Sequence, residues 1–363
     1  MTVGALIAQR ARRFGPLRYD EVLDLALYHE EHGFYTTCAG AGRAGGDFLT
    51  SPEVGPLFGA VLARALDGWW DELGRPDPYV VVEGGAGSGA LAASILAAQP
   101  ACGPALRYLL VERSPAWRAE HARRLPLEPA GLVLATDRDG GAPHDAGAGP
   151  LVASLEGLPP GPFDGVVLAN ELLDNLPFRL LQRAAAGWDE VRVDADLHEV
   201  LVRAPLDGDR LAPGAPGGAR IPVQERAAAW VRAACDSLRR GRVVAIDYAD
   251  TTPSMARRPW TDWVRTYRGH QRGGPPLDHL GEQDVTCEVA ADQLPPPSAD
   301  QSQADFLRAH GIDARAGDAR RRWRDRAHVG DLEALTARST VQEAAALTDP
   351  AGLGAFRVLT WVR

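Results

Sequence analysis

The sequence contains no lysine, so all 39 of its basic residues are arginine. A phosphate-binding P-loop needs its lysine, and Schiff-base chemistry with pyridoxal phosphate needs a lysine amine, so both are excluded. Cysteine is also scarce. The cysteines are far apart and form no CxxC pair, which predicts reduced thiols and no metal site. They are Cys38, Cys102, Cys235 and Cys287.

The sequence also lacks an apolar run long enough to span a membrane, and its N-terminus has no signal-peptide core. Together with the reduced cysteines, this predicts a cytoplasmic protein without membrane contact. Arg10, Arg12, Arg13 and Arg18 precede the first acid, Asp20, a composition shared with organelle presequences. We interpret this segment as a short solvated helix. The net charge of −9 argues against general nucleic-acid binding, so we expect no nucleic-acid partner.

With 363 residues and 45% hydrophobic composition, the chain can form one core with an appended subdomain. Helical apolar spacing predicts a helix over 57–73 that stops at Gly74. Strands that alternate with helices predict an α/β protein with a parallel, doubly wound sheet. The candidate strands are Tyr79–Glu83, Leu106–Glu112, Gly131–Ala135, Gly165–Ala169, Val243–Tyr248 and a closing strand at Phe356–Val362.

The most informative segment is YVVVEGGAGSG at 79–89, in which an apolar strand ends in Glu83 and a glycine-rich turn follows. Glycine allows a tight turn and a close approach to a ligand, and the next helix offers its N-terminal N–H groups. The turn glycines are Gly84, Gly85, Gly87 and Gly89. Acid-x-Gly-x-Gly-x-Gly resembles motif I of the class I S-adenosylmethionine (SAM) methyltransferases. Dinucleotide binding and a turn that binds no ligand are the alternatives.

A second acid supports a nucleoside cofactor. Glu112 ends the next apolar run, about twenty-five residues after the glycine turn, near the spacing at which an acid binds ribose hydroxyls. Because NAD and SAM both carry such a ribose, Glu112 does not choose between them. A strand-end acid without a ligand is the structural alternative.

Two further polar segments are candidates for the site. In GGDFLTSPE, Ser51 is a natural helix N-cap, whereas capping does not explain Asp47 or Thr50. In ANELLDNLP, Asn170, Glu171 and Asp174 follow the fourth strand, where ligands bind in a doubly wound sheet. A capped surface helix is the alternative for the second segment.

Taken together, these segments resemble the MidA-like methyltransferase family, which includes a mitochondrial complex I assembly factor that methylates arginine. The resemblance runs almost end to end, through LALYHEEHGFY, GDFLTSPEVGPLFG, VVEGGAGSGAL, VERSP, LANELLDNLP, GWDEVRV, AIDYAD, YRGH, GEQDVTCEV, QADFLRAHGI and LTDPAGLGAFRVL. The chain departs from the family pattern at Gly84–Gly87, at Asn175, where the family usually has alanine, and at Ala249.

The resemblance implies a class I Rossmann-like fold that binds SAM. The pattern of helices and strands along the chain predicts four parts: an N-terminal helical extension with a cofactor-covering loop (1–78), a SAM-binding core (79–250), an insertion or substrate lid (251–345) and a closing strand (346–363). Asp47, Thr50 and Ser51 would cover the methionine end, Glu83 would contact the ammonium group, and Glu112 would bind the ribose.

For the reaction, the resemblance implies in-line methyl transfer to nitrogen, with Glu171, Asp174 and Asn170 at the acceptor. The resemblance to an arginine-methylating family implies protein arginine as the acceptor, and two acids suit it because carboxylates bind a guanidinium bidentately. The alternatives are a small-metabolite methyltransferase and a SAM-binding assembly factor with little catalysis. No metal is expected, and a homodimer is one expected assembly.

Overall fold

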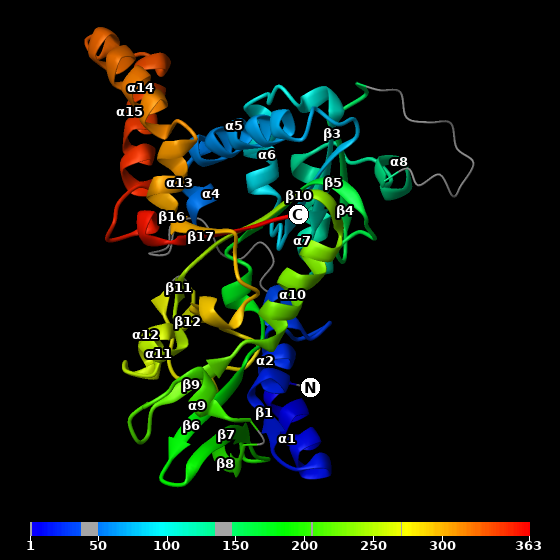
Figure 1. Cartoon of the computed structure of the whole chain (residues 1–363), viewed down its shortest axis with the longest axis vertical. Coiled ribbons are helices and arrows are strands. Elements are labelled where there is room, and N and C mark those ends of the chain that lie inside the picture. The colour runs from blue at the N-terminus through cyan, green and yellow to red at the C-terminus, as the bar shows by residue number, and fades with distance from the viewer. Residues whose placement is uncertain (1, 38–49, 135–146, 205, 270) are drawn as a thin grey trace.

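The computed structural model describes residues 2–37, 50–134, 147–204, 206–269 and 271–363. Its centre is a seven-stranded sheet with the order β16-β17-β10-β5-β2-β3-β4 (Figure 1). The strands are β2 (Tyr79–Gly84), β3 (Leu106–Val111), β4 (Leu151–Leu155), β5 (Phe163–Asn170), β10 (Leu238–Asp247), β16 (Ala299–Ser302) and β17 (Arg357–Val362).

Five neighbouring strands of this sheet, from β4 to β10, are parallel, whereas β17 is antiparallel to both of its neighbours. The chain runs outward from β2 through β3 to β4, and then returns to β5 on the other side of β2. The order therefore reverses between β2 and β5, and ligands bind at the carboxyl ends of the strands beside such a reversal. The expected doubly wound fold is confirmed.

Helices cover both faces of the central sheet. Helices α5 (Pro56–Glu72), α6 (Ala90–Ala97) and α13 (Gln303–Ala309) pack on one face, and α10 (Glu225–Asp236) packs on the other. Every residue of β2 is buried, as a central parallel strand requires. Helix α5 confirms the helix predicted from apolar spacing.

A second, antiparallel sheet lies below the central one in Figure 1 and packs against α1 (Val3–Phe14) and α2 (Tyr19–Tyr28). The buried face of α1 shows that the basic N-terminal segment is a packed helix. The sheet consists of β1 (Leu17–Arg18), β6 (Arg179–Ala184), β7 (Gly187–Val193), β8 (Glu199–Arg203) and β9 (Arg220–Val223).

These pairings differ from the predicted division of the chain. Strands β6 to β9 fall within 79–250 but form a separate sheet, because β6, β7 and β8 are consecutive antiparallel hairpin strands. Strand β16 falls within the predicted insertion 251–345 but pairs with β17 in the central sheet. The division into domains stays a prediction.

One predicted strand is wrong. Residues 130–134 form the helix α8 (Ala130–Leu134), and the corresponding edge strand is β4, which begins at Leu151. A short apolar run such as Gly131–Leu134 has no periodicity that separates a helix from a strand. The other five predicted strands correspond to β2, β3, β5, β10 and β17.

The remaining elements are short, except for α7 and a helical hairpin of α14 and α15 that extends from the core in Figure 1. No helix in the described part of the chain is both long and apolar enough to cross a bilayer. These elements are α3 (Phe34–Thr37), α4 (Ser51–Val54), α7 (Pro115–Arg124), α9 (Gly208–Leu211), β11 (Ala249–Asp250), α11 (Thr252–Met255), α12 (Trp260–Trp263), β12 (Val264–Arg268), β13 (Gln271–Arg272), β14 (Asp284–Cys287), β15 (Val289–Ala290), α14 (Ile312–Arg326) and α15 (Leu332–Leu347).

Candidate active site

The glycine turn lies at the carboxyl end of β2, beside the reversal of strand order. Gly85, Gly87 and Gly89 have φ angles of 66°, 51° and 77°, which side chains rarely adopt. Gly84 is required for another reason: a Cβ atom there would lie 2.4 Å from Cζ2 of Trp230 on α10. The turn leads directly into α6, whose N-terminus faces the same edge of the sheet.

Two side chains hold the peptide groups of Gly87. Its N–H donates to Oε2 of Glu112 (2.9 Å), and its carbonyl oxygen lies 2.8 Å from Nε2 of His121. The other ring nitrogen of His121 lies 2.8 Å from Oγ of Ser154, and burial lowers the pKa of this histidine. A neutral His121 therefore donates to Gly87 and accepts from the serine hydroxyl. Sequence reasoning missed His121, which no motif contains.

Glu112 lies immediately after β3, as predicted. Its Oε1 atom accepts the N–H of Ser114 (2.8 Å), the N-cap residue of α7. Burial raises its pKa, against the lowering effect of the backbone hydrogen bonds. Glu112 thus connects the glycine turn to the start of α7, and its binding to ribose stays a prediction.

Glu83 is buried, with 4% of its surface exposed. Its Oε2 atom accepts a hydrogen bond from the Tyr108 hydroxyl (2.7 Å). Burial raises the pKa of Glu83 to about 7, although the bonds from Tyr108 and from the N–H of Ala92 lower it. These contacts hold Glu83 between the sheet and α6, and its expected contact with an ammonium group stays a prediction.

The raised pKa of Glu83 predicts a pH dependence of stability. The ordinary pKa of a glutamate side chain is 4.5. Between pH 4.5 and pH 7, Glu83 therefore binds a proton in the folded protein but not in the unfolded chain. The free energy of unfolding therefore falls as pH rises through this window, by about 3 kcal/mol in total once the pH is above 7. Glu83→Gln keeps the hydrogen bond from Tyr108 but has no carboxyl group to titrate, so it removes this pH dependence. Urea unfolding at pH 5 and pH 8 should show a smaller pH difference for Glu83→Gln than for wild type.

The exposed Glu128 provides the matched control for this measurement. Glu128→Gln should keep the wild-type pH dependence of unfolding, because the side chain of Glu128 lies exposed on the surface and is not part of the buried contacts of Glu83. If Glu83→Gln shows the same pH dependence as Glu128→Gln, the raised pKa of Glu83 is refuted.

The TSPE segment contacts the segment after β5. Thr50, not the expected Ser51, is the N-cap of α4, and its N–H donates to Glu53 Oε2 (3.2 Å) in a capping box. The N–H of Ser51 donates to Oε1 of Glu171 (3.2 Å), and its hydroxyl donates to Oε1 of Gln303 (3.0 Å). Asp47 lies outside the described residues.

The ANELLDNLP segment begins where β5 ends. Glu171 has a φ of 50°, a strained conformation for a residue with a side chain, and its N–H donates to the carbonyl of Ile246 on β10 (2.9 Å). The Nδ2 group of Asn170 donates to Oε1 of Glu171 (3.1 Å). The Oδ1 atom of Asn170 is buried and has no hydrogen-bond partner among the described residues. This oxygen is available to a donor on a ligand.

Asp174 lies in the same segment, with 3% of its surface exposed. Burial raises its pKa well above the ordinary value, and Asp247, Glu171 and Asp284 add to this effect. Asp247 ends β10 and accepts the N–H groups of Leu173 (2.9 Å) and Asp174 (3.2 Å) on one oxygen. Burial and Glu171 raise the pKa of Asp247 to about 8. The charged groups that raise the pKa of Asp174 are thus all acids, and such a group of acids suits a cationic ligand.

Strand β14 contributes the fourth acid, Asp284, which lies opposite Tyr267 of β12. The Tyr35 hydroxyl lies 2.8 Å from Oδ1 of Asp284 and 2.6 Å from Oδ1 of Asn175. Glu171, Asp174, Asp247 and Asp284 are hereafter called the acid cluster. Sequence reasoning predicted two of them; Asp247 and Asp284 lay in quoted segments whose acids could not be placed without the fold.

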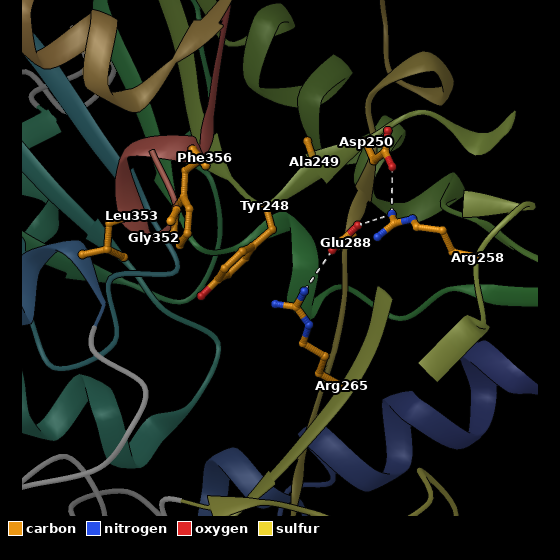
Figure 2. Close-up of a pocket in the computed structure, with 11 residues that line it drawn as sticks. Tyr248, Ala249, Asp250, Arg258, Arg265, Glu288, Gly352, Leu353 and Phe356 are labelled. Atoms are coloured by element: carbon orange, nitrogen blue, oxygen red, sulfur yellow. Dashed lines mark hydrogen bonds and ion pairs between the residues drawn. The ribbon is translucent and has the colours of Figure 1, made fainter. Parts of the chain in front are cut away.

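A pocket of about 450 Å³ opens beside Tyr248, the residue after Asp247. Figure 2 shows the Tyr248 ring beside Phe356, and the ring centroids are 4.0 Å apart. On the other side of the pocket, Glu288 pairs with Arg258 (2.7 Å) and Arg265 (3.0 Å). The pocket therefore combines an aromatic wall with a charged wall, and it adjoins the strand that carries Asp247.

The residues at this edge of the sheet fit a nucleoside cofactor. The left-handed glycine turn, the N-terminus of α6, the acid after β3 and the unpartnered oxygen of Asn170 all lie at the carboxyl ends of neighbouring strands. Within the described residues, no group of three or more histidine, cysteine or acidic side chains could hold a metal ion. The fold and the site define an α/β enzyme that binds a nucleoside cofactor.

Comparison with known proteins specifies the class. The family described as "Putative S-adenosyl-L-methionine-dependent methyltransferase" matches residues 61–308, and the chain belongs to this family. A crystal structure of a Burkholderia thailandensis protein bound to S-adenosylhomocysteine is 28% identical, covers 99% of this chain and 92% of its own, and has a TM-score of 0.78. The chain is thus a SAM-dependent methyltransferase, and the dinucleotide alternative is excluded.

Curated relatives are named as mitochondrial protein arginine methyltransferases. The Danio rerio NDUFAF7 is 28% identical over 336 residues, 85% of this chain and 76% of the relative. The Drosophila melanogaster homolog is 27% identical over 297 residues, 76% of this chain and 65% of the relative. The match to the human protein, at 30% identity, spans 42% of that relative. The expected cytoplasmic location is wrong on this comparison, because these relatives are named as mitochondrial.

Proposed function

We propose that this methyltransferase acts on the guanidinium group of a protein arginine, which binds at the acid cluster. The observation that carries the proposal is the position of the buried Asp174, whose N–H donates to Asp247 and whose neighbour Asn175 shares the Tyr35 hydroxyl with Asp284. A buried cluster of this kind is stabilised by a bound cation, because an opposite charge favours the ionised carboxylates. A guanidinium also presents a planar set of donors that carboxylates accept bidentately.

The cofactor would lie along the glycine turn. Gly84, Gly85, Gly87 and Gly89 leave room for its methionine end, Glu112 would bind the ribose hydroxyls, and the unpartnered Asn170 oxygen would accept one donor. Glu83 would act on the ammonium group from inside the sheet, and Thr50 and Ser51 would close the methionine end together with Asp47. When bound, SAM supplies an activated methyl group on sulfur.

The protein contributes orientation and charge to the reaction. Glu171 and Asp174 would hold the acceptor nitrogen in line with the methyl group, which replaces a bimolecular encounter with a bound geometry. The same carboxylates would stabilise positive charge on the acceptor and take up the proton that the nitrogen loses. The strained φ of Glu171 fits this role, since such strain is concentrated at functional sites.

The pocket beside Tyr248 would receive the chain that flanks the arginine. Its aromatic wall of Tyr248 and Phe356 suits an apolar neighbour, and Arg258 and Arg265 suit a polar or acidic one (Figure 2). The names of the curated relatives support a protein rather than a small molecule as the acceptor.

The test is incubation of the enzyme with methyl-labelled SAM and a cell extract that lacks this protein. The protein fraction is then hydrolysed and its amino acids are separated. We expect label in methylarginine, because the acid cluster favours a guanidinium over a neutral acceptor. Label that is confined to small metabolites, or to residues other than arginine, would refute the proposed acceptor.

A further inference from the structure

Asn175 is held on every side by hydrogen bonds. Its Nδ2 group donates to Oδ1 of Asp174 (2.9 Å) and to the carbonyl oxygen of Glu171 (3.3 Å), and its Oδ1 atom accepts from the Tyr35 hydroxyl (2.6 Å). Both amide hydrogens and the amide oxygen are therefore in use. A flipped amide would place its oxygen against the carbonyl oxygen of Glu171, so the contacts favour the orientation described.

Tyr35 is itself fixed from two directions. Its carbonyl oxygen accepts from the hydroxyl of Ser114 (2.7 Å), whose N–H donates to the cofactor-side acid Glu112. Its own hydroxyl also lies 2.8 Å from Oδ1 of Asp284. Tyr35 thus connects the end of β3, where the ribose is expected, with the acid cluster on the other side.

Asp174 uses only one oxygen in these contacts. Its Oδ1 atom accepts from Asn175, and within the described segments no hydrogen bond from another residue is found at its Oδ2 atom. A carboxyl group held by one oxygen presents the other to a ligand in a fixed direction, which is the preorganisation that charge stabilisation requires.

We propose that Asn175 and Tyr35 are positioning residues that orient the Asp174 carboxyl group so that its Oδ2 atom binds the acceptor cation. This inference rests on the proposed function. It assigns a role to Asn175, one of the positions at which the chain departs from its family's pattern, and it makes Tyr35 of the N-terminal segment part of the acceptor site. Neither side chain needs to touch the acceptor to act.

The first test is Tyr35→Phe, which removes the hydroxyl and keeps the ring that packs against Tyr28 at 5.3 Å. Turnover in the methylation assay should fall about 10-fold, as for the loss of one hydrogen bond in a preorganised site. The affinity for S-adenosylhomocysteine and the melting temperature should stay near wild type. Tyr28→Phe is the matched control, because the hydrogen bond of its hydroxyl within the described residues goes to the backbone oxygen of Asn175 (3.1 Å) and not to a side chain of the acid cluster. It should keep turnover within about threefold.

The second test compares Asn175→Asp with Asn175→Ala across pH. The groups that face the amide are Asp174, Glu171 and Tyr35, with Asp247 and Asp284 behind them. A protonated aspartic acid can still donate to Asp174, whereas an ionised one repels it. Turnover of Asn175→Asp relative to wild type should therefore fall as pH rises from 6 to 8.5. The loss in Asn175→Ala should not change with pH, and a merely structural role would give both variants the same profile.

Binding of N-acetylarginine amide to the protein saturated with S-adenosylhomocysteine gives a readout besides turnover. Wild type should bind this probe about 10-fold more tightly than Tyr35→Phe. Equal turnover and equal probe binding in Tyr35→Phe and wild type would overturn the positioning role while leaving the proposed function intact. A wild-type enzyme that neither binds the probe nor labels arginine would overturn the proposed function itself.

Discussion

Glu171→Gln and Asp174→Asn should each lower the rate of methyl transfer about 10²- to 10³-fold while leaving the affinity for S-adenosylhomocysteine nearly unchanged. Each substitution replaces a carboxylate that would hold the acceptor nitrogen with a neutral amide of the same shape. Loss of one preorganised charged contact in a buried site raises the barrier by about 3–4 kcal/mol. Single-turnover transfer from labelled SAM measures the rate, and calorimetry measures cofactor binding.

The control for this experiment lies at the opposite end of β5, the strand that leads to Glu171. Asp164, at the amino end of β5, pairs with Arg240 far along the strand from Glu171. Asp164→Asn should keep the wild-type rate. Nearly full activity in Glu171→Gln would show that the acid cluster does not hold the acceptor, whereas an equal loss in Asp164→Asn would indicate a general effect on folding.

Gly87→Val should reduce binding of SAM and S-adenosylhomocysteine at least 100-fold. Gly87 has a φ of 51°, and its N–H and carbonyl oxygen are bonded to Glu112 and His121. A β-branched residue is strained in this conformation by about 1–3 kcal/mol, and its side chain would project from the turn that the cofactor must approach. Calorimetry with SAM, S-adenosylhomocysteine and NAD should show binding of the first two by wild type, and of none by the variant.

Gly218→Val separates backbone strain from the loss of the site. Gly218 also has a positive φ, 80°, and lies in an exposed turn, where an added Cβ atom would meet no other atom within 4 Å. This control should lose some stability but bind the cofactor normally. Tight binding of S-adenosylhomocysteine by Gly87→Val would mean that the cofactor does not follow the glycine turn.

The parts of the fold that follow from local sequence were predictable. Strand β2 reads as four consecutive apolar residues that end in Glu83 and a glycine turn, and α5 shows apolar residues at helical spacing. The strand predicted at 131–135 was wrong, because so short an apolar run shows no periodicity that distinguishes a helix from a strand. The second sheet was not predicted. Strands β6, β7 and β8 pair through hairpins, and the apolar pattern alone does not distinguish hairpin strands from the strands of an alternating strand–helix core.

The site was predictable only where its residues share one segment. Glu171 and Asp174 are close together in sequence and follow a recognisable strand, so their segment could be identified. Asp284 and Tyr35 are 249 residues apart in sequence and meet through one hydroxyl contact. No spacing rule brings such residues together; only the packing of α2, α3 and β14 around the segment after β5 does.

The most direct test of the central claim is a crystal structure with a bisubstrate analogue in which a guanidine is joined to adenosine at the position of the cofactor sulfur. The adenosine should lie along the glycine turn with its ribose at Glu112, and the guanidinium should contact the carboxylates of Glu171 and Asp174. A guanidinium that lies away from the acid cluster while the adenosine occupies the glycine turn would contradict the assignment of these acids to the acceptor.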